Sequence, residues 1–389
     1  MGAIVDVDSH WTFPYEFRVH GGPLKPFAAE LPGEGELLAY FLAGDLLRSL
    51  PAEERPSAHQ LFPTRDQPGL GETHVQPRFE GNRLPSSATD RLAWMDRIGI
   101  GYALVNSGAF PAAFPLIQDL PARRRYIQAC NDELAAALDG HGARLGAVTY
   151  ADLTDLDWAI AELVRMRAAG SRAFSIMAEP VGGMSLGHPH FDRLWAACVD
   201  LGMIVSVHTG LAPAMFGDWG RLGLDFAETQ ARGRLLRMAN IQRHQAVELI
   251  LCALLFGGVF ERHPKLTVLV AELNVGWLPA LVQRVAMFGS WSDNVFGPWL
   301  AEESPADILR RQVKASPLPG LGDIDALDVL EALPDMLCWS SDYPHSEGNA
   351  DPIALYGERL ERLPAGLRAD FMGDTIRECF ARTGDPVVA

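Results

Sequence analysis

Cysteine is scarce in this sequence, and the few cysteines that it has are isolated. The chain contains five cysteines among 389 residues, and none of them stands in a Cys-x-x-Cys motif. An odd number of scattered thiols argues against a disulfide framework. We therefore expect reduced, mostly buried thiols, as in a cytoplasmic protein.

Positive charge and long apolar runs are also in short supply. The chain has 33 Lys and Arg residues against 49 Asp and Glu, a formal net charge of −16. Nucleic acids and anionic membrane surfaces both require a basic patch, so neither is an expected partner. No apolar run reaches the 18 or so residues of a transmembrane helix, and the N-terminus lacks the pattern of a signal peptide. The expected partner is a small-molecule substrate, and the expected location is the cytoplasm.

Short apolar, β-branched runs alternate with amphipathic helical patterns along most of the chain. Alternation of this kind is typical of a parallel sheet, and eight strands predict a (β/α)8 TIM barrel. We expect a single barrel domain over residues 1–389. The eight predicted strands are residues 3–7, 102–106, 145–150, 172–177, 203–208, 267–272, 312–316 and 336–341.

Residues 14–87 interrupt the alternation directly after the first predicted strand. They are rich in Pro and Gly and contain one helical patch. An insertion at this point leaves the C-terminal face of the barrel, where barrel enzymes carry their active sites. The insertion either caps that face or is a packed surface excursion, and the sequence favours the two readings equally.

The first strand ends in a cluster of polar residues. In the stretch IVDVDSHW, Asp6, Asp8 and His10 stand at every second position. Side chains two residues apart in a strand leave the same face, so one face would carry two carboxylates and an imidazole. Burying such groups is costly unless a partner neutralises them. The pattern therefore points to something bound at this end of the strand.

Further polar residues are predicted at the same end of other strands. His208 ends the fifth strand, Glu272 ends the sixth, and Asp342 follows the eighth, with His345 three residues later. His244 stands where the helix before the sixth strand is predicted to begin. Carboxylates and imidazoles together are ligands for zinc, manganese or iron. The sequence thus predicts a metal site built from separate segments of the chain.

Each of these residues also has an ordinary structural explanation. His208 could be a core histidine, Asp342 could begin a turn, and Glu272 could cap a helix. His244 could lie on a helix surface. Their joint position at one end of the barrel is the stronger argument. Three further histidines, His188, His190 and His263, are predicted to lie in a turn or at the opposite end of a strand.

Five stretches resemble the amidohydrolase superfamily, in the branch that includes aminocarboxymuconate semialdehyde and resorcylate-type decarboxylases. They are DVDSHW, DRLAWMDRIGI, FDRLWAACVDLGMIVSVHTG, FGGVFERHPKLTVLVAELNVGWLP and WSSDYPHSEG, and they occur in family order. The resemblance covers about residues 1–13 and 88–385. It implies a (β/α)8 barrel with a divalent metal. By family position, the ligands would be Asp8, His10, His208 and Asp342.

Two positions depart from the familiar members of this superfamily. Members with two metals often bridge them with a modified lysine after the fourth strand, and SRAFSIMAEP contains no lysine. The decarboxylases usually carry a histidine at the end of the sixth strand, where this chain has Glu272. Glu272, His244 and His345 are then additional candidate ligands. The chain also resembles a small group of diiron oxygenases within the superfamily. The shared features are the acidic residue at the end of the sixth strand, Glu272, and the histidine that precedes this strand, His244.

Three hypotheses follow, and we place the first ahead of the second. The first is a nonheme diiron monooxygenase that uses O₂ and an electron donor to hydroxylate a small hydrophobic acyl or terpenoid-type substrate. The second is a nonoxidative decarboxylase or hydrolase of a small carboxylic acid with one Zn or Mn. In it, Glu272 acts as acid or base and Asp342 positions or deprotonates water. The third, a barrel that has lost catalysis and serves as a subunit of a paired enzyme, is opposed by the complete ligand set. The resemblance also leads us to expect a homodimer.

Overall fold

The structure is a computed structural model. It describes residues 3–11, 87–107, 117, 119–208, 234, 237–238, 241–291, 295, 297–299, 301–318, 326–344 and 351–387. All of the predicted insertion except Ser87 lies outside these residues, so its position over the barrel stays a prediction. The same holds for the single-domain boundary of 1–389.

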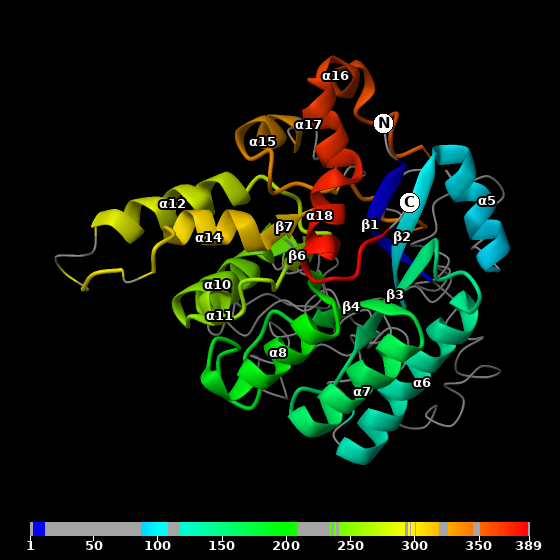
Figure 1. The fold of residues 1–389 in the computed structure, drawn as a ribbon, viewed down its shortest axis with the longest axis horizontal. Coiled ribbons are helices and arrows are strands. Elements are labelled where there is room, and N and C mark those ends of the chain that lie inside the picture. Colours follow the sequence, from blue (N-terminus) through cyan, green and yellow to red (C-terminus); the bar gives the residue numbers. More distant parts are fainter. Residues whose placement is uncertain are drawn as a thin grey trace.

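Seven parallel strands follow one another in chain order around the fold, with helices between them (Figure 1). Each strand hydrogen-bonds to the next one along the chain, as in a (β/α)8 barrel. The strands are β1 (Ile4–His10), β2 (Ile100–Asn106), β3 (Leu145–Tyr150), β4 (Ser171–Ile176), β5 (Ile204–His208), β6 (Val268–Ala271) and β7 (Val313–Ala315). Each of them lies within about three residues of a predicted strand, which confirms the predicted fold class.

Residues 336–343 occupy the eighth position without forming a regular strand. On one side, the Ala315 backbone N–H donates to Met336 (2.8 Å), and Cys338 donates back to Ala315 (2.9 Å). On the other side, His10 donates to the carbonyl of Tyr343 (2.7 Å). The segment therefore bonds to both β7 and β1 and closes the barrel. The predicted strand 336–341 is replaced by isolated bridges at Leu337 and Tyr343.

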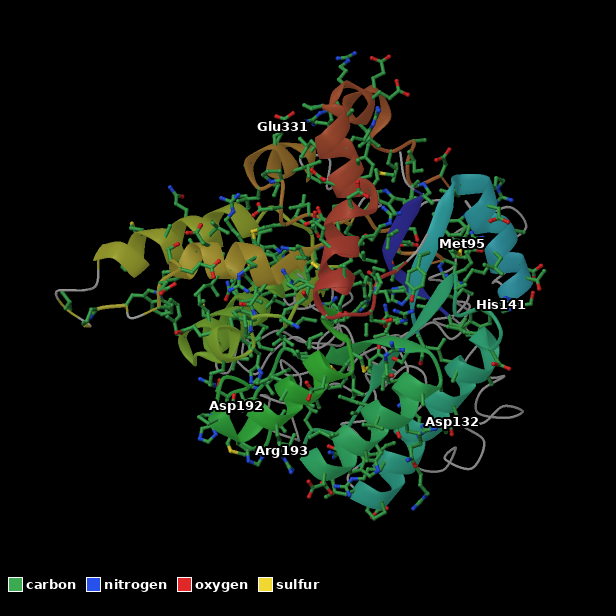
Figure 2. The ribbon with its side chains drawn as sticks, viewed as in Figure 1. Met95, Asp132, His141, Asp192, Arg193 and Glu331 are labelled. Carbon is green, nitrogen blue, oxygen red and sulfur yellow. The ribbon has the colours of Figure 1, made fainter. Side chains whose placement is uncertain are left out.

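The helices form the outer layer of the barrel. They are α5 (Ala88–Ile98), α6 (Leu120–Leu138), α7 (Leu156–Ala168), η5 (Pro189–Phe191), α8 (Asp192–Asp200), α10 (His244–Phe256), α11 (Val259–Arg262), α12 (Leu278–Trp291), α14 (Pro305–Gln312), α15 (Ala326–Ala332), α16 (Gly357–Arg362), α17 (Ala365–Ala369), η8 (Asp370–Asp374) and α18 (Thr375–Arg382). Charged side chains such as Asp132, Arg193 and Glu331 project outward from this layer (Figure 2). None of the described helices is long and apolar enough to cross a membrane.

Apolar side chains fill the inside of the barrel. Val5 and Val7 of β1 pack inside the barrel with every second residue of the neighbouring strands. The residues between them in those strands pack against the helices. Ile376, Cys379 and Phe380 of α18 belong to the same inner cluster. Because the interior is a packed core closed by α18, the C-terminal ends of the strands are left for chemistry.

Candidate metal centre

The end of β1 carries three polar side chains, but only two of them join the same group. The pairing of β1 with β2 shifts register between Asp6 and Ser9, as at a β-bulge. The carboxylate of Asp6 accepts hydrogen bonds from the backbone N–H (2.9 Å) and hydroxyl (2.5 Å) of Ser341. The prediction that Asp6 shares a face with Asp8 and His10 was therefore wrong, because counting alternate residues assumes a regular strand.

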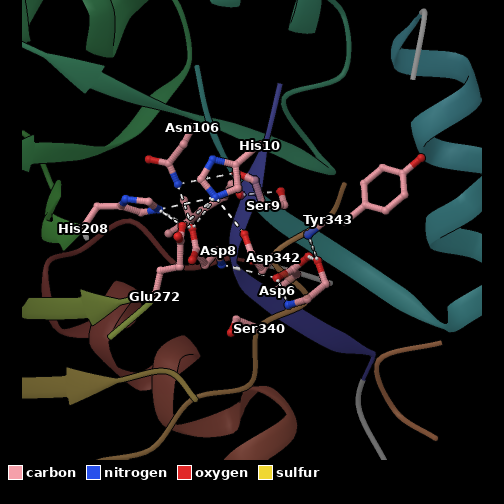
Figure 3. Close-up of polar contacts among 12 residues, drawn as sticks. Asp6, Asp8, Ser9, His10, Asn106, His208, Glu272, Ser340, Asp342 and Tyr343 are labelled. Carbon is pink, nitrogen blue, oxygen red and sulfur yellow. Dashed lines mark hydrogen bonds and ion pairs between the residues drawn. The ribbon is translucent and has the colours of Figure 1, made fainter. Parts of the chain in front are cut away.

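Two carboxylates and two imidazoles converge at the C-terminal ends of β1, β5 and β6 (Figure 3). Nε2 of His208 lies 3.0 Å from Oε2 of Glu272 and 3.4 Å from Oδ1 of Asp8. Nε2 of His10 lies 3.5 Å from each of the same two oxygens and 3.3 Å from Nε2 of His208. One ligand atom from each residue thus lies close to one from every other. We call this group the four-ligand group; its members are Asp8, His10, His208 and Glu272.

Asp342 lies at the edge of the four-ligand group. Its Oδ1 is 3.1 Å from Nε2 of His10, and its backbone N–H donates to the carbonyl of Asp8 (2.9 Å). Asp342 and Glu272 both have left-handed backbone conformations, with φ of 52° and 58°. Such conformations are uncommon for residues other than glycine and are concentrated at functional sites. The bend at Asp342 also explains why the eighth segment does not continue as a strand.

Neighbouring side chains hold the end of β1 in place. Asn106, the last residue of β2, donates from Nδ2 to Oδ1 of Asp8 (2.9 Å). Arg91 of α5 donates to the hydroxyl of Ser9 (3.0 Å) and to the carbonyl of His10. Arg91 is completely buried, which lowers its pKa to about 10, so the guanidinium stays charged at neutral pH. These bonds fix the backbone and the carboxylate orientation that the four-ligand group requires.

The charges of the group depend on one another. Burial alone would lower the pKa of His208, but Asp8 and Glu272 raise it well above its ordinary value. Burial would raise the pKa of Glu272, but His208 and His10 hold it well below its ordinary value. The carboxylates therefore require positive charge beside them, supplied either by protonated imidazole or by a cation.

The residues of the four-ligand group fit a divalent cation. Bonds of about 2.0–2.1 Å in a tetrahedral site would separate neighbouring ligand atoms by about 3.3 Å, and the separations here are 3.0–3.5 Å. Oδ2 of Asp8 is buried and has no hydrogen-bond partner among the described residues. A buried carboxylate oxygen of this kind is costly unless a cation or donor meets it. Mixed carboxylate and imidazole ligands suit zinc, manganese or iron.

One predicted ligand, His244, does not join this group, and another cannot be placed. His244 is the first residue of α10 and is partly exposed, and the four-ligand group does not include it. His345 lies outside the described residues. Two histidines that we predicted to lie away from the site do so. His188 caps η5, and Nε2 of His263, at the N-terminal end of β6, lies 3.7 Å from Oδ1 of Asp192.

Sequence reasoning missed Asn106 and Arg91. Asn106 is the last residue of β2, so the rule that found His208 at the end of β5 could have found it too. Arg91 gave no signal, because an arginine in an amphipathic helix is usually exposed. Its burial depends on the packing of α5 against β1 and the segment 336–343.

The chain is similar to several solved structures over almost its whole length. An amidohydrolase from Mycobacterium avium subsp. paratuberculosis K-10 is 20% identical with a TM-score of 0.68, and the match covers 97% of this chain and 99% of that one. A 2,6-dihydroxybenzoate decarboxylase from Rhizobium is 18% identical with a TM-score of 0.61, covering 98% and 99%. A manganese-containing 5-carboxyvanillate decarboxylase from Novosphingobium aromaticivorans DSM 12444 is 17% identical with a TM-score of 0.62, covering 98% and 97%. These likenesses show the barrel fold.

Structural likeness at this low sequence identity shows the fold, and a family model shows which protein family the chain belongs to. The model described as amidohydrolase matches residues 7–382, from β1 to the end of α18. That span includes all four residues of the four-ligand group and Asp342. The chain therefore belongs to the amidohydrolase family and is a metal-dependent enzyme of that superfamily.

Proposed function

We propose that this enzyme is a nonoxidative decarboxylase of a small carboxylic acid that uses one divalent cation, zinc or manganese. The observation that carries the proposal is the four-ligand group with Asp342 at its edge. One set of ligand atoms at this spacing suits one cation. The decarboxylases among the similar structures support this reaction better than they support the diiron monooxygenase that we placed first from the sequence.

The residues divide into those that would hold the cation and one that would move a proton. Asp8, His10, His208 and Glu272 would be the ligands. A bound cation would hold a substrate oxygen and withdraw negative charge from it. Glu272 lies close to both imidazoles, and these hold its pKa low, so it suits a ligand better than a proton donor. This changes the catalytic role that we expected for Glu272.

Asp342 is the better candidate for proton transfer. When the carbon–carbon bond to the carboxylate breaks, its electron pair stays on the substrate carbon, and CO₂ leaves. That carbon then takes a proton from the carboxyl group of Asp342, which regains one from solvent. The carboxyl lies 3.1 Å from Nε2 of His10, beside the place where the substrate oxygen would be held. Its left-handed backbone fixes it at that edge.

A second candidate is O₂-dependent hydroxylation with two irons. Glu272 favours it, because this carboxylate stands where the decarboxylases that the sequence resembles usually carry histidine. Two irons would require a second set of ligands, for which His244 and His345 are the candidates. The reaction would also need O₂ and an external electron donor. The homodimer that we expected stays a prediction under either candidate.

An anaerobic activity assay separates the two candidates. The protein, loaded with Mn²⁺ or Zn²⁺ under nitrogen, would be incubated with 2,6-dihydroxybenzoate and 5-carboxyvanillate, the acids named for the similar enzymes. We expect CO₂ release without O₂ from one of these acids or a related one, and its loss in Asp342→Asn. Substrate turnover that occurs only with iron, O₂ and a reductant would overturn the proposal.

A further inference from the structure

The carboxylate of Asp6 does not join the four-ligand group but contacts the residue before Asp342 (Figure 3). Its Oδ1 accepts hydrogen bonds from the backbone N–H groups of Ser341 (2.9 Å) and Asp8 (3.3 Å), and its Oδ2 accepts from the hydroxyl of Ser341 (2.5 Å). Asp6 is completely buried. A buried carboxylate without donors would be costly, and these three donors satisfy it. The proposed reaction gives Asp6 no role.

Ser341 extends this support to the other side of Asp342. Its hydroxyl donates to Asp6 and accepts from the backbone N–H of Tyr343 (3.0 Å). The N–H of Asp342 itself donates to the carbonyl of Asp8 (2.9 Å). Three consecutive N–H groups thus end on acceptors that β1 or Ser341 supplies. These bonds hold the chain on both sides of Asp342, which fixes the direction in which its side chain leaves the backbone.

The backbone of Asp342 requires such support because it has a left-handed conformation, with φ of 52°. A residue with a Cβ is strained there, and the conformation persists only where the surrounding structure imposes it. In a regular parallel strand, the same N–H groups would donate to carbonyls of the neighbouring strand. Here a carboxylate and a hydroxyl replace two of those carbonyls. The bend is thereby held, and Oδ1 of Asp342 lies 3.1 Å from Nε2 of His10.

The bonds of Asp6 support Asp342 more than they support the metal ligands. Two of its three donors belong to Ser341, and the bond from the N–H of Asp8 is the longest of the three. The carboxylate of Asp8 is oriented separately, by the side chain of Asn106 (2.9 Å). Loss of the bonds between Asp6 and Ser341 should therefore move Asp342 and leave the bound cation in place.

We propose that Asp6 and Ser341 are positioning residues, which together set the place of the Asp342 carboxyl group at the edge of the metal centre. The inference rests on the proposed function, because that function assigns the proton transfer to Asp342. Neither positioning residue touches the reacting carbon. Both act on the rate through the position of Asp342.

Two neighbouring serines provide the test and its control. Ser341→Ala should lower kcat by about 10²-fold, the cost of displacing a reacting group by about 1 Å, with KM and metal content unchanged. Ser340→Ala should leave kcat unchanged, because Ser340 is also buried but its hydroxyl donates to the carbonyl of Pro317 (3.0 Å). Ser341→Thr keeps a hydroxyl and should restore most of the rate. If Ser341→Ala does not fold, Asp6→Asn, which loses the acceptor for that hydroxyl, takes its place.

A double variant separates positioning from a general loss of structure. Whatever rate Asp342→Asn retains should fall no further when Ser341→Ala is added, because residues that act as one unit are not additive. A purely structural defect would lower kcat in both backgrounds. Additive losses would therefore overturn the proposal, as would a parental kcat in Ser341→Ala.

Crystal structures of the Mn²⁺-loaded parent and of Mn²⁺-loaded Ser341→Ala test the placement without turnover. We expect the four-ligand group to coincide and Oδ1 of Asp342 to shift by more than about 0.5 Å, the tolerance of a catalytic geometry. A shifted carboxyl, with no CO₂ released by the parent from any acid, would keep the positioning role and reject decarboxylation. CO₂ release by the parent, with the Asp342 carboxyl unmoved in the variant, would keep the reaction and reject the positioning role.

Discussion

The side chains of the metal centre differ in how they are held, and that decides what each substitution should do. His208 is a predicted ligand at the end of β5, with both carboxylates of the four-ligand group within 3.4 Å of its Nε2. Asn106 donates from its side chain to Asp8 and is not itself a ligand. Asp342 lies at the edge, beside His10. Removal of a ligand, of a supporting amide and of a proton donor should therefore be distinguishable.

His208→Ala and Asp342→Ala should each abolish activity while the fold survives. The first removes a ligand, so we expect bound metal to be lost; the second removes the proton donor, so we expect metal to remain. A general acid contributes about 10²–10⁴-fold to a rate. Metal content, kcat and the circular dichroism spectrum of each variant check this. His190→Ala, an exposed histidine of η5, is the control. Either variant retaining near-parental activity would contradict the assignment.

Asn106→Ala should weaken metal binding without removing a ligand. Its Nδ2 donates to Asp8 Oδ1 (2.9 Å), which orients the carboxylate. Loss of an orienting partner of this kind typically costs about 10–100-fold in metal affinity. Titration with Zn²⁺ or Mn²⁺ against a competing chelator measures the change. An unchanged dissociation constant would mean that Asp8 is held by its backbone alone.

Among the elements, α5 supports the metal centre from outside the barrel. Arg91 lies between the rings of Trp11 and Tyr343, with its guanidinium carbon 5.6 and 5.2 Å from their centroids. Trp94 stacks on Tyr343 at 3.8 Å. The helix thereby joins the end of β1 to the segment 336–343, which together carry Asp8, His10 and Asp342.

Arg91→Met should destabilise the protein by about 1.5–3 kcal/mol, because a hydrogen bond to a charged group is worth about that much. The substitution keeps most of the side-chain volume but removes the donors to Ser9 and to the carbonyl of His10. Urea unfolding of both proteins gives the difference. Arg97→Met, at the exposed end of the same helix, should change stability by less than about 0.5 kcal/mol. Equal effects of the two substitutions would rule out this role for Arg91.

At the scale of the whole molecule, the sequence predicted the barrel because strand and helix periodicities alternate regularly. It also predicted that His208 and Glu272 meet, because parallel strands end at one face. Two local departures were beyond it. The bulge in β1 turns Asp6 toward Ser341, and the left-handed backbone of Asp342 breaks the last strand into bridges. Both depend on long-range backbone pairing, which a count of alternate residues cannot see.

The contacts that support the centre were hidden for a related reason. The burial of Arg91 joins segments more than 80 residues apart in the sequence, through Ser9 and His10. An arginine in a helical pattern usually faces solvent. Only the closed barrel brings this side chain beneath the site.

Metal content tests the central claim most directly. The protein would be purified without chelator and without added metal, and analysed for bound elements. The four-ligand group predicts about one zinc or manganese per chain, reduced to background in His208→Ala. About two irons per chain would contradict a single-cation centre, because the four ligand atoms described here provide one such site.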